Sequence, residues 1–213
     1  MWNRLRSAGR LLAASIVLVA LVVLPASAQP SVTEWGLGYA SSFATGGPAS
    51  VVHSTNFSSL EVVGLVRSAS GSWWRIEHPI ALIADARLAN TALGPATAYG
   101  IGPSREWRVG QAPRATARAF GIRPLAVRLG LGPEFVSIQA DAAGGALLFD
   151  IPAPAANTTR FNFTAEVALG LRVQVPYAHV AAGYRLHHLS NGGLGRVNPG
   201  VDSHMLYVEF TLF

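Results

Sequence analysis

The chain has 213 residues, of which 50% are hydrophobic and 13% charged, with 22 Gly, 13 Pro and no Cys. These counts exclude disordered, collagen-like and disulfide-stabilised proteins, and the length suits one domain. The formal net charge is +5, but Arg4, Arg6 and Arg10 lie in the first ten residues. Without them 13 arginines face 11 acidic residues, a net charge of +2. Composition therefore gives little support for nucleic-acid binding.

The first 28 residues have the layout of a secretory signal peptide. A basic segment, residues 1–10, precedes the apolar run 11–24, and Ala26-Ser27-Ala28 offers small residues for cleavage. The apolar run of about 14 residues is shorter than the roughly 20 that a transmembrane helix needs. We therefore expect residues 1–28 to be removed on export and residues 29–213 to form the mature domain.

In chain order, the mature sequence is a series of long segments in which apolar and polar residues alternate. The alternation predicts strands at 33–42, 58–68, 73–88, 117–131, 135–149, 160–175, 177–191 and 203–213. In 160–175 every odd position is apolar, whereas Arg160, Glu166 and Arg172 share the other face. In 73–88 the expected apolar face is Trp74, Ile76, Ile80, Leu82, Ala84 and Leu88, opposite Arg75, Glu77, Asp85 and Arg87.

Strands of this length suit a membrane better than a soluble sheet. Soluble strands usually have about 5–6 residues, whereas a tilted strand needs about 9–11 to cross a bilayer. Short connections at 68–72, 132–134 and 176 alternate with longer ones at 43–57, 89–116, 150–159 and 192–202. The sequence therefore predicts an all-β fold, an eight-stranded antiparallel outer-membrane barrel with both termini in the periplasm.

The alternative fold is a soluble periplasmic sandwich or lipocalin-like barrel with its apolar faces turned inward. Charged residues such as Arg160, Glu166 and Arg172 favour the membrane barrel, because they can form ion pairs inside a narrow eight-stranded cylinder. A soluble lipid carrier and a non-catalytic structural or adhesive barrel are the corresponding alternative functions.

Two polar side chains interrupt the apolar face of segment 177–191 near its end. Beyond Leu186, the next positions on that face are His188 and Ser190, separated by two residues of strand rise, or about 6.6 Å. Such a pair can supply a general base and a nucleophile. Asp202 follows the next loop and can fold back to fix the tautomer of the histidine.

The loop between these residues is suited to an oxyanion site. Its glycines let backbone N–H groups approach a substrate, and Asn191 and Asn198 add amide donors. His53, His78 and His204 show no metal-ligand spacing.

The segments His188-Leu189-Ser190-Asn191-Gly192-Gly193-Leu194 and Asn198-Pro199-Gly200-Val201-Asp202-Ser203 resemble the active-site signature of the PagL family of outer-membrane lipid A 3-O-deacylases. The resemblance implies that Ser190 is the nucleophile, His188 the base and Asp202 the orienting acid. It also implies that the Gly193 N–H and the Asn198 side chain hold the oxyanion. The family pattern has Glu at the acid position, and Asp202 is one methylene shorter.

We therefore expect a serine esterase that removes the ester-linked hydroxyacyl chain at the 3-position of lipid A, the lipid part of lipopolysaccharide, without a cofactor. The substrate would reach the outer wall by diffusion within the outer leaflet. Arg196 is a candidate ligand for a sugar phosphate, and Asn191 is a further candidate substrate contact. The sequence leaves a homodimer open, and in the non-catalytic alternative Asp202 would mark a lost activity.

Overall fold

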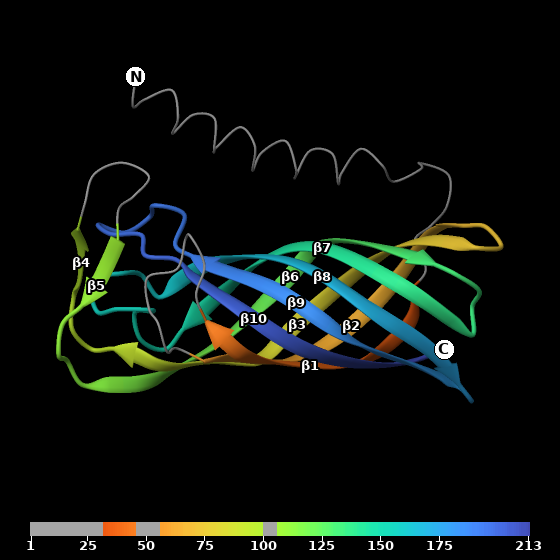
Figure 1. Ribbon diagram of the computed structural model, residues 1–213, viewed down its shortest axis with the longest axis horizontal. Helices are drawn as coiled ribbons and strands as arrows, with labels where there is room; N and C mark the ends of the chain where they lie inside the picture. Colours follow the sequence, from red (N-terminus) through yellow and green to blue (C-terminus); the bar gives the residue numbers. More distant parts are fainter. Residues whose placement is uncertain (1–31, 46–55, 100–105) are drawn as a thin grey trace, which may run out of the picture.

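The computed structural model describes residues 32–45, 56–99 and 106–213. Its strands are β1 (Val32–Thr45), β2 (Phe57–Ser70), β3 (Trp74–Ala92), β4 (Ala96–Tyr99), β5 (Glu106–Val109), β6 (Arg114–Leu131), β7 (Val136–Phe149), β8 (Phe161–Val175), β9 (Ala178–Ser190) and β10 (Val201–Leu212). Eight of them close into an antiparallel barrel in the order β1-β10-β9-β8-β7-β6-β3-β2, which confirms the predicted fold class (Figure 1). No helix among the described residues is long and apolar enough to span a membrane. The expected signal peptide, 1–28, lies outside these residues.

The outer wall of the barrel is apolar. In β8 the odd-numbered side chains point outward, and Val167 and Leu169 are 53% and 58% exposed. The even-numbered Asn162, Glu166 and Arg172 are buried in the lumen. This is the reverse of a soluble lipid carrier, whose apolar side chains face inward, and it is the polarity of a barrel surrounded by lipid.

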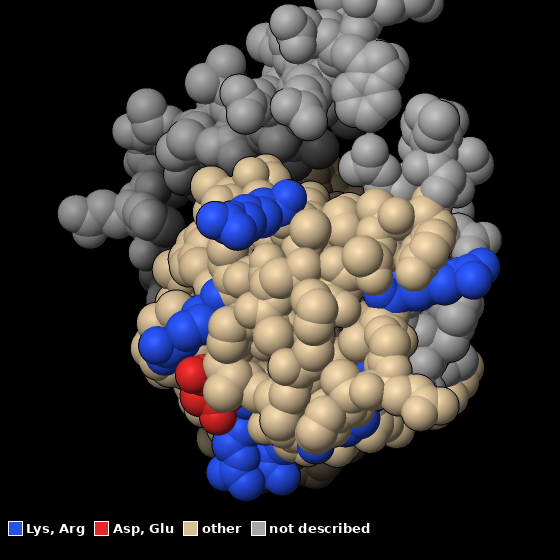
Figure 2. Space-filling view, turned by 90° about the vertical axis from the view of Figure 1, so that its left-hand side faces the viewer, with Lys and Arg blue, Asp and Glu red and all other residues tan. Residues whose placement is uncertain are grey.

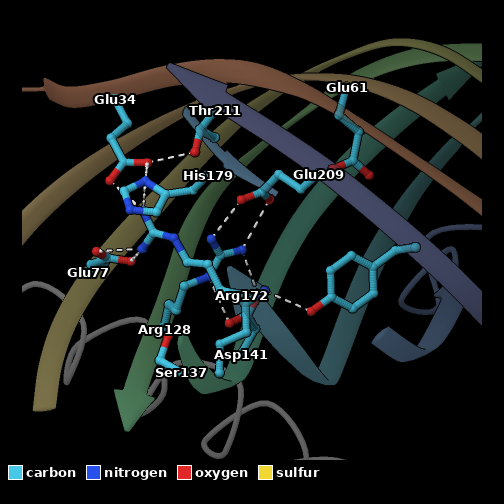
Figure 3. A network of polar contacts seen from close by, with 12 residues as sticks. Glu34, Glu61, Glu77, Arg128, Ser137, Asp141, Arg172, His179, Glu209 and Thr211 are labelled. Atoms are coloured by element: carbon cyan, nitrogen blue, oxygen red, sulfur yellow. Dashed lines mark hydrogen bonds and ion pairs between the residues drawn. The ribbon is translucent and has the colours of Figure 1, made fainter. Parts of the chain in front are cut away.

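The lumen is filled by charged side chains that pair with one another (Figure 3). Arg172 Nη1 lies 3.1 Å from both carboxylate oxygens of Glu77, and Arg172 also bonds Glu34. Arg128 lies between two carboxylates, with Nε 2.9 Å from Asp141 and Nη1 2.7 Å from Glu209. These pairs compensate charges that would otherwise be costly to remove from water.

A further group of ion pairs lies in the lumen nearer the end of the barrel that carries the long loops. Arg123 bridges Glu61 and Glu166, with N–O distances of 2.7 Å to each. The expectation of lumenal ion pairs is therefore confirmed for Glu166 and Arg172. The expectation was wrong for Arg160, which is exposed just before β8 and whose Nε donates to the Phe149 carbonyl.

Short and long connections lie at opposite ends of the barrel (Figure 1). The expectation of a loop over 89–116 was partly wrong, because β3 continues to Ala92 and β6 begins at Arg114. Between them β4 pairs with β5 as a separate hairpin. This hairpin docks on the neighbouring loop through Asn157, whose side chain accepts from Ala96 N at 2.8 Å and donates to Ala96 O at 2.9 Å.

A β-bulge in β3 reverses the faces predicted for its last residues. Leu60 pairs with Asp85 and Glu61 with Ile83, so Ala84 is an extra residue in β3. Beyond it Leu88 is fully buried, whereas the Arg87 side chain is 52% exposed. The expectation that Leu88 shares the outward face and that Asp85 and Arg87 share the lumenal one was wrong, because one inserted residue shifts a period-two pattern to the other face.

Candidate active site

The candidate site lies where β9 ends and β10 begins. His188 is directly opposite Asp202 in the β9–β10 ladder, and Ser190 is opposite Phe163 in the β8–β9 ladder. His188 and Ser190 are half-buried on the outward face, the face on which the alternation places them. His187, between Leu186 and His188, is buried in the lumen, where its ring stacks on Phe57 with centroids 4.3 Å apart.

One short polar contact joins His188 and Asp202. The imidazole Nδ1 lies 2.6 Å from the carboxylate Oδ1. The Asp202 side chain is 13% exposed and the His188 side chain 36%, so the contact is partly shielded from water. A bond from Nδ1–H to the carboxylate selects the tautomer whose Nε2 carries the lone pair. Nε2 is thereby available to accept a proton.

Ser190 lies two residues beyond His188 on the same face of β9. Among the described residues its hydroxyl makes no hydrogen bond with His188, since their Cα atoms are about 6.6 Å apart along the strand. Rotation of the two side chains toward each other is needed to close that distance. The structure therefore brings together His188 and Asp202, and places Ser190 beside them without a contact.

The loop 191–200 is organised around Asn191, which is 1% exposed. Its backbone N–H donates to Asn198 Oδ1 at 2.9 Å, and its Nδ2 donates to Val197 O at 2.8 Å. Its Oδ1 accepts from the Gly193 N–H at 2.9 Å. Asn191 thus uses its polar groups within the loop. Its burial contrasts with the exposed position expected of a residue that contacts substrate directly.

Two glycines allow the backbone conformation of this loop. Gly192 and Gly193 have φ angles of +62° and +82°, which side-chain-bearing residues rarely adopt. The path leaves Asn198 and Arg196 exposed on the loop. Arg196 belongs to an end of the barrel where arginine side chains are spread around the rim and acidic ones are few (Figure 2).

An aromatic surface borders Ser190 on the β8 side. Phe161 and Phe163 pack edge to face, with ring centroids 5.1 Å apart, and are 40% and 44% exposed. Gly192 lies against the Phe163 ring, because a Cβ added there would be 2.9 Å from it. The alternation placed both rings on the outward face. Their position next to Ser190 depends on the strand register, which the sequence alone does not give.

The family of the chain follows from a match that contains this whole site. A family model described as "Lipid A 3-O-deacylase (PagL)" matches residues 52–211. The chain belongs to the PagL family. Among solved structures, the crystal structure of the outer membrane enzyme PagL is similar to this family member with a TM-score of 0.56 and 16% identity. The similarity covers 82% of this chain and 97% of that chain, and it concerns the fold. No curated protein matches.

Proposed function

We propose that this PagL family member releases the 3-O-acyl chain of lipid A with Ser190 as nucleophile, His188 as general base and Asp202 as the acid that orients His188. The family supplies the reaction, deacylation of lipid A. The residue assignment is carried by the 2.6 Å contact between His188 Nδ1 and Asp202 Oδ1, on the face that also holds Ser190.

The proposed reaction has two halves. His188 Nε2 takes the proton from Ser190 Oγ as that oxygen bonds to the carbonyl carbon of the acyl ester. The ester C–O bond then breaks, and His188 returns the proton to the departing sugar oxygen. Water attacks the acyl-enzyme with His188 again as base, which releases the fatty acid and restores Ser190. Asp202 stays ionised and stabilises the imidazolium.

We assign the oxyanion donors to the Gly193 N–H and the Asn198 Nδ2. Asn198 Oδ1 is held by the Asn191 N–H at 2.9 Å, so the amide is oriented and its Nδ2 serves the substrate. The Gly193 N–H bonds Asn191 Oδ1 in the structure, and the oxyanion shares or replaces that acceptor. Asn191 acts by holding the loop, and Arg196 is the residue we assign to a phosphate of lipid A.

The proposed location is the outer membrane, after export by the signal peptide 1–28. Lipid A then reaches the wall of the barrel by lateral diffusion, and its acyl chains lie along Phe161 and Phe163, which are exposed beside Ser190. The scheme uses only groups of the protein and water. It requires one copy of the chain, so it does not depend on a homodimer.

The test compares Ser190→Ala and His188→Ala with a matched control, Ser203→Ala. Ser203 is fully buried on the lumenal side of β10, next to Asp202, so its variant removes a nearby hydroxyl that the scheme does not use. All three variants should keep the gel mobility shift of a folded barrel. The first two should lose acyl release from purified lipopolysaccharide, measured by mass spectrometry, and Ser203→Ala should retain it. Undiminished release by Ser190→Ala would remove the proposal.

A further inference from the structure

Two arginines stand side by side on the outer wall at a distance from Ser190. Arg87 of β3 and Arg118 of β6 are directly opposite each other in the β3–β6 ladder, and both are exposed. The Cβ atoms of directly opposed residues are about 4.5–5.5 Å apart, so the two side chains share one small patch.

The two carboxylates near this patch, Asp85 and Asp150, engage only one of its two guanidinium groups. Asp85 Oδ2 lies 2.6 Å from Arg87 Nη2 and offsets one positive charge. The nearby Asp150 carboxylate accepts instead from the backbone N–H groups of Arg118 and Ile151, at 2.8 and 2.9 Å. The guanidinium of Arg118 makes no hydrogen bond or ion pair with any residue that the structure describes. Like charges directly opposite each other weaken a strand ladder. An anion bound between Arg87 and Arg118 would relieve that repulsion.

The bulge at Ala84 is what places Arg87 on the wall, since without it Arg87 would face the lumen. On the apolar part of the same two strands, Leu82, Phe120 and Ile122 are 54%, 61% and 53% exposed. The patch therefore lies where the apolar band of β3 and β6 gives way to charge. A ligand for it would combine an anionic group with hydrocarbon chains.

We propose that Arg87 and Arg118 form a second, non-catalytic lipid site, which holds a phosphate of lipid A as a bound neighbour of the barrel. Guanidinium groups donate in a fork that matches two phosphate oxygens. The acyl chains of the lipid lie along Leu82, Phe120 and Ile122. The lipid class rests on the proposed outer-membrane location, whereas the site itself rests on the arginine pair.

This site is separate from the candidate active site. In the barrel order, β8 and β7 lie between β9 and β6, and β1 and β2 lie between β10 and β3. The β3–β6 pair is therefore on the opposite side of the cylinder from the β9–β10 pair. A lipid held by Arg87 and Arg118 does not reach Ser190, so it is not consumed.

The test counts the lipids bound to full-length Ser190→Ala protein in detergent by native mass spectrometry, with lipid A that carries or lacks its phosphates. We expect two bound molecules of the phosphorylated lipid. Adding Arg87→Gln and Arg118→Gln should weaken one of them about tenfold, a usual effect of losing a charge-assisted hydrogen bond. Arg108→Gln, which removes an exposed arginine of β5 at the same end of the barrel, should leave both. Asp85→Asn should strengthen the second, because it removes the offsetting carboxylate.

Three results would overturn the proposal. One is equal binding by the double variant and its parent, and another is an equal loss in Arg108→Gln, which would indicate general charge attraction. The third is displacement of the lipid by millimolar inorganic phosphate, which would indicate a site for free phosphate. With Ser190 present, the double variant should release acyl chains at the parent rate. Failure of the catalytic proposal would appear separately, as acyl release by Ser190→Ala.

Discussion

His188 Nδ1 and Asp202 Oδ1 lie 2.6 Å apart because the two residues are direct partners in the β9–β10 ladder. The pairing of β9 with β10 fixes the positions of both Cα atoms, so the short side chain of Asp202 reaches the imidazole of His188. In this chain Asp202 is thus matched to its histidine.

Substitutions at Asp202 should affect the orientation of the His188 imidazole and not the binding of lipid A. Asp202→Ala and Asp202→Asn remove the acceptor that selects the Nδ1–H tautomer, so we expect kcat to fall about a hundredfold or more with little change in KM. The kcat of Asp202→Glu should fall less, because this variant keeps the carboxylate but displaces the imidazole. Steady-state release of fatty acid from lipid A measures both constants. Full activity of Asp202→Ala would place the third catalytic group elsewhere.

Asn198 makes one observed contact, through Oδ1, and we propose a second role for its Nδ2. Asn198→Asp keeps the Oδ1 acceptor for the Asn191 N–H, at 2.9 Å in the structure, but replaces the donor that we assign to the oxyanion. We expect kcat to fall about 10²–10³-fold, the usual effect of losing one oxyanion donor. Asn198→Ala should lose activity and also loosen the loop. If Asn198→Asp turns over at the normal rate, the donor is a different group.

Gly192 and Gly193 form a matched pair for testing the loop. A Cβ on Gly192 would lie 2.9 Å from the Phe163 ring, whereas one on Gly193 meets no atom within 4 Å. Both alanine variants carry backbone strain of about 1–2 kcal/mol from a positive φ. Gly192→Ala should in addition push the loop from the aromatic surface and lower kcat/KM much more than Gly193→Ala. Equal losses in the two variants would show that strain alone matters.

The lumenal ion pairs should dominate the stability of the barrel. Arg128→Met leaves Asp141 and Glu209 without their partner, and we expect a loss of about 3–5 kcal/mol in the free energy of unfolding. Combining it with Asp141→Asn and Glu209→Gln should restore much of that loss. Arg87→Gln breaks an exposed pair and should cost less than about 1 kcal/mol. Urea unfolding in lipid vesicles, followed by tryptophan fluorescence, measures each value.

Much of the fold could be predicted because outward apolar residues and lumenal polar residues alternate along each strand of a membrane barrel. Segment 160–175 shows this most clearly, because the outward residues and the lumenal Glu166 and Arg172 are those that the alternation predicts, with Arg160 as the exception. The faces of the residues after Ala84 could not be predicted, since a bulge depends on the pairing of two strands and is not visible in the sequence of one of them. The β4–β5 hairpin was missed because each of its strands has only four residues.

The site could be predicted only in part. His188 and Ser190 stand out because they interrupt an apolar face, and Asp202 stands out because it follows a loop rich in Gly and Asn. The remaining contacts depend on the register between paired strands. Arg172 and Glu34, which form an ion pair, are 138 positions apart in the chain. Phe163 and Ser190 are neighbours only because β8 pairs with β9 in this register. Neither relation can be read from spacing in the sequence.

The filled lumen has a consequence for the cell that makes this protein. Arg128 and Arg172 are among the largest fully buried side chains, so large side chains occupy the lumen at their level. We therefore expect hydrophilic antibiotics and dyes not to pass through the barrel at that level. In that case many copies of this barrel in one membrane would add no passage for small solutes, unlike porins of similar secondary structure.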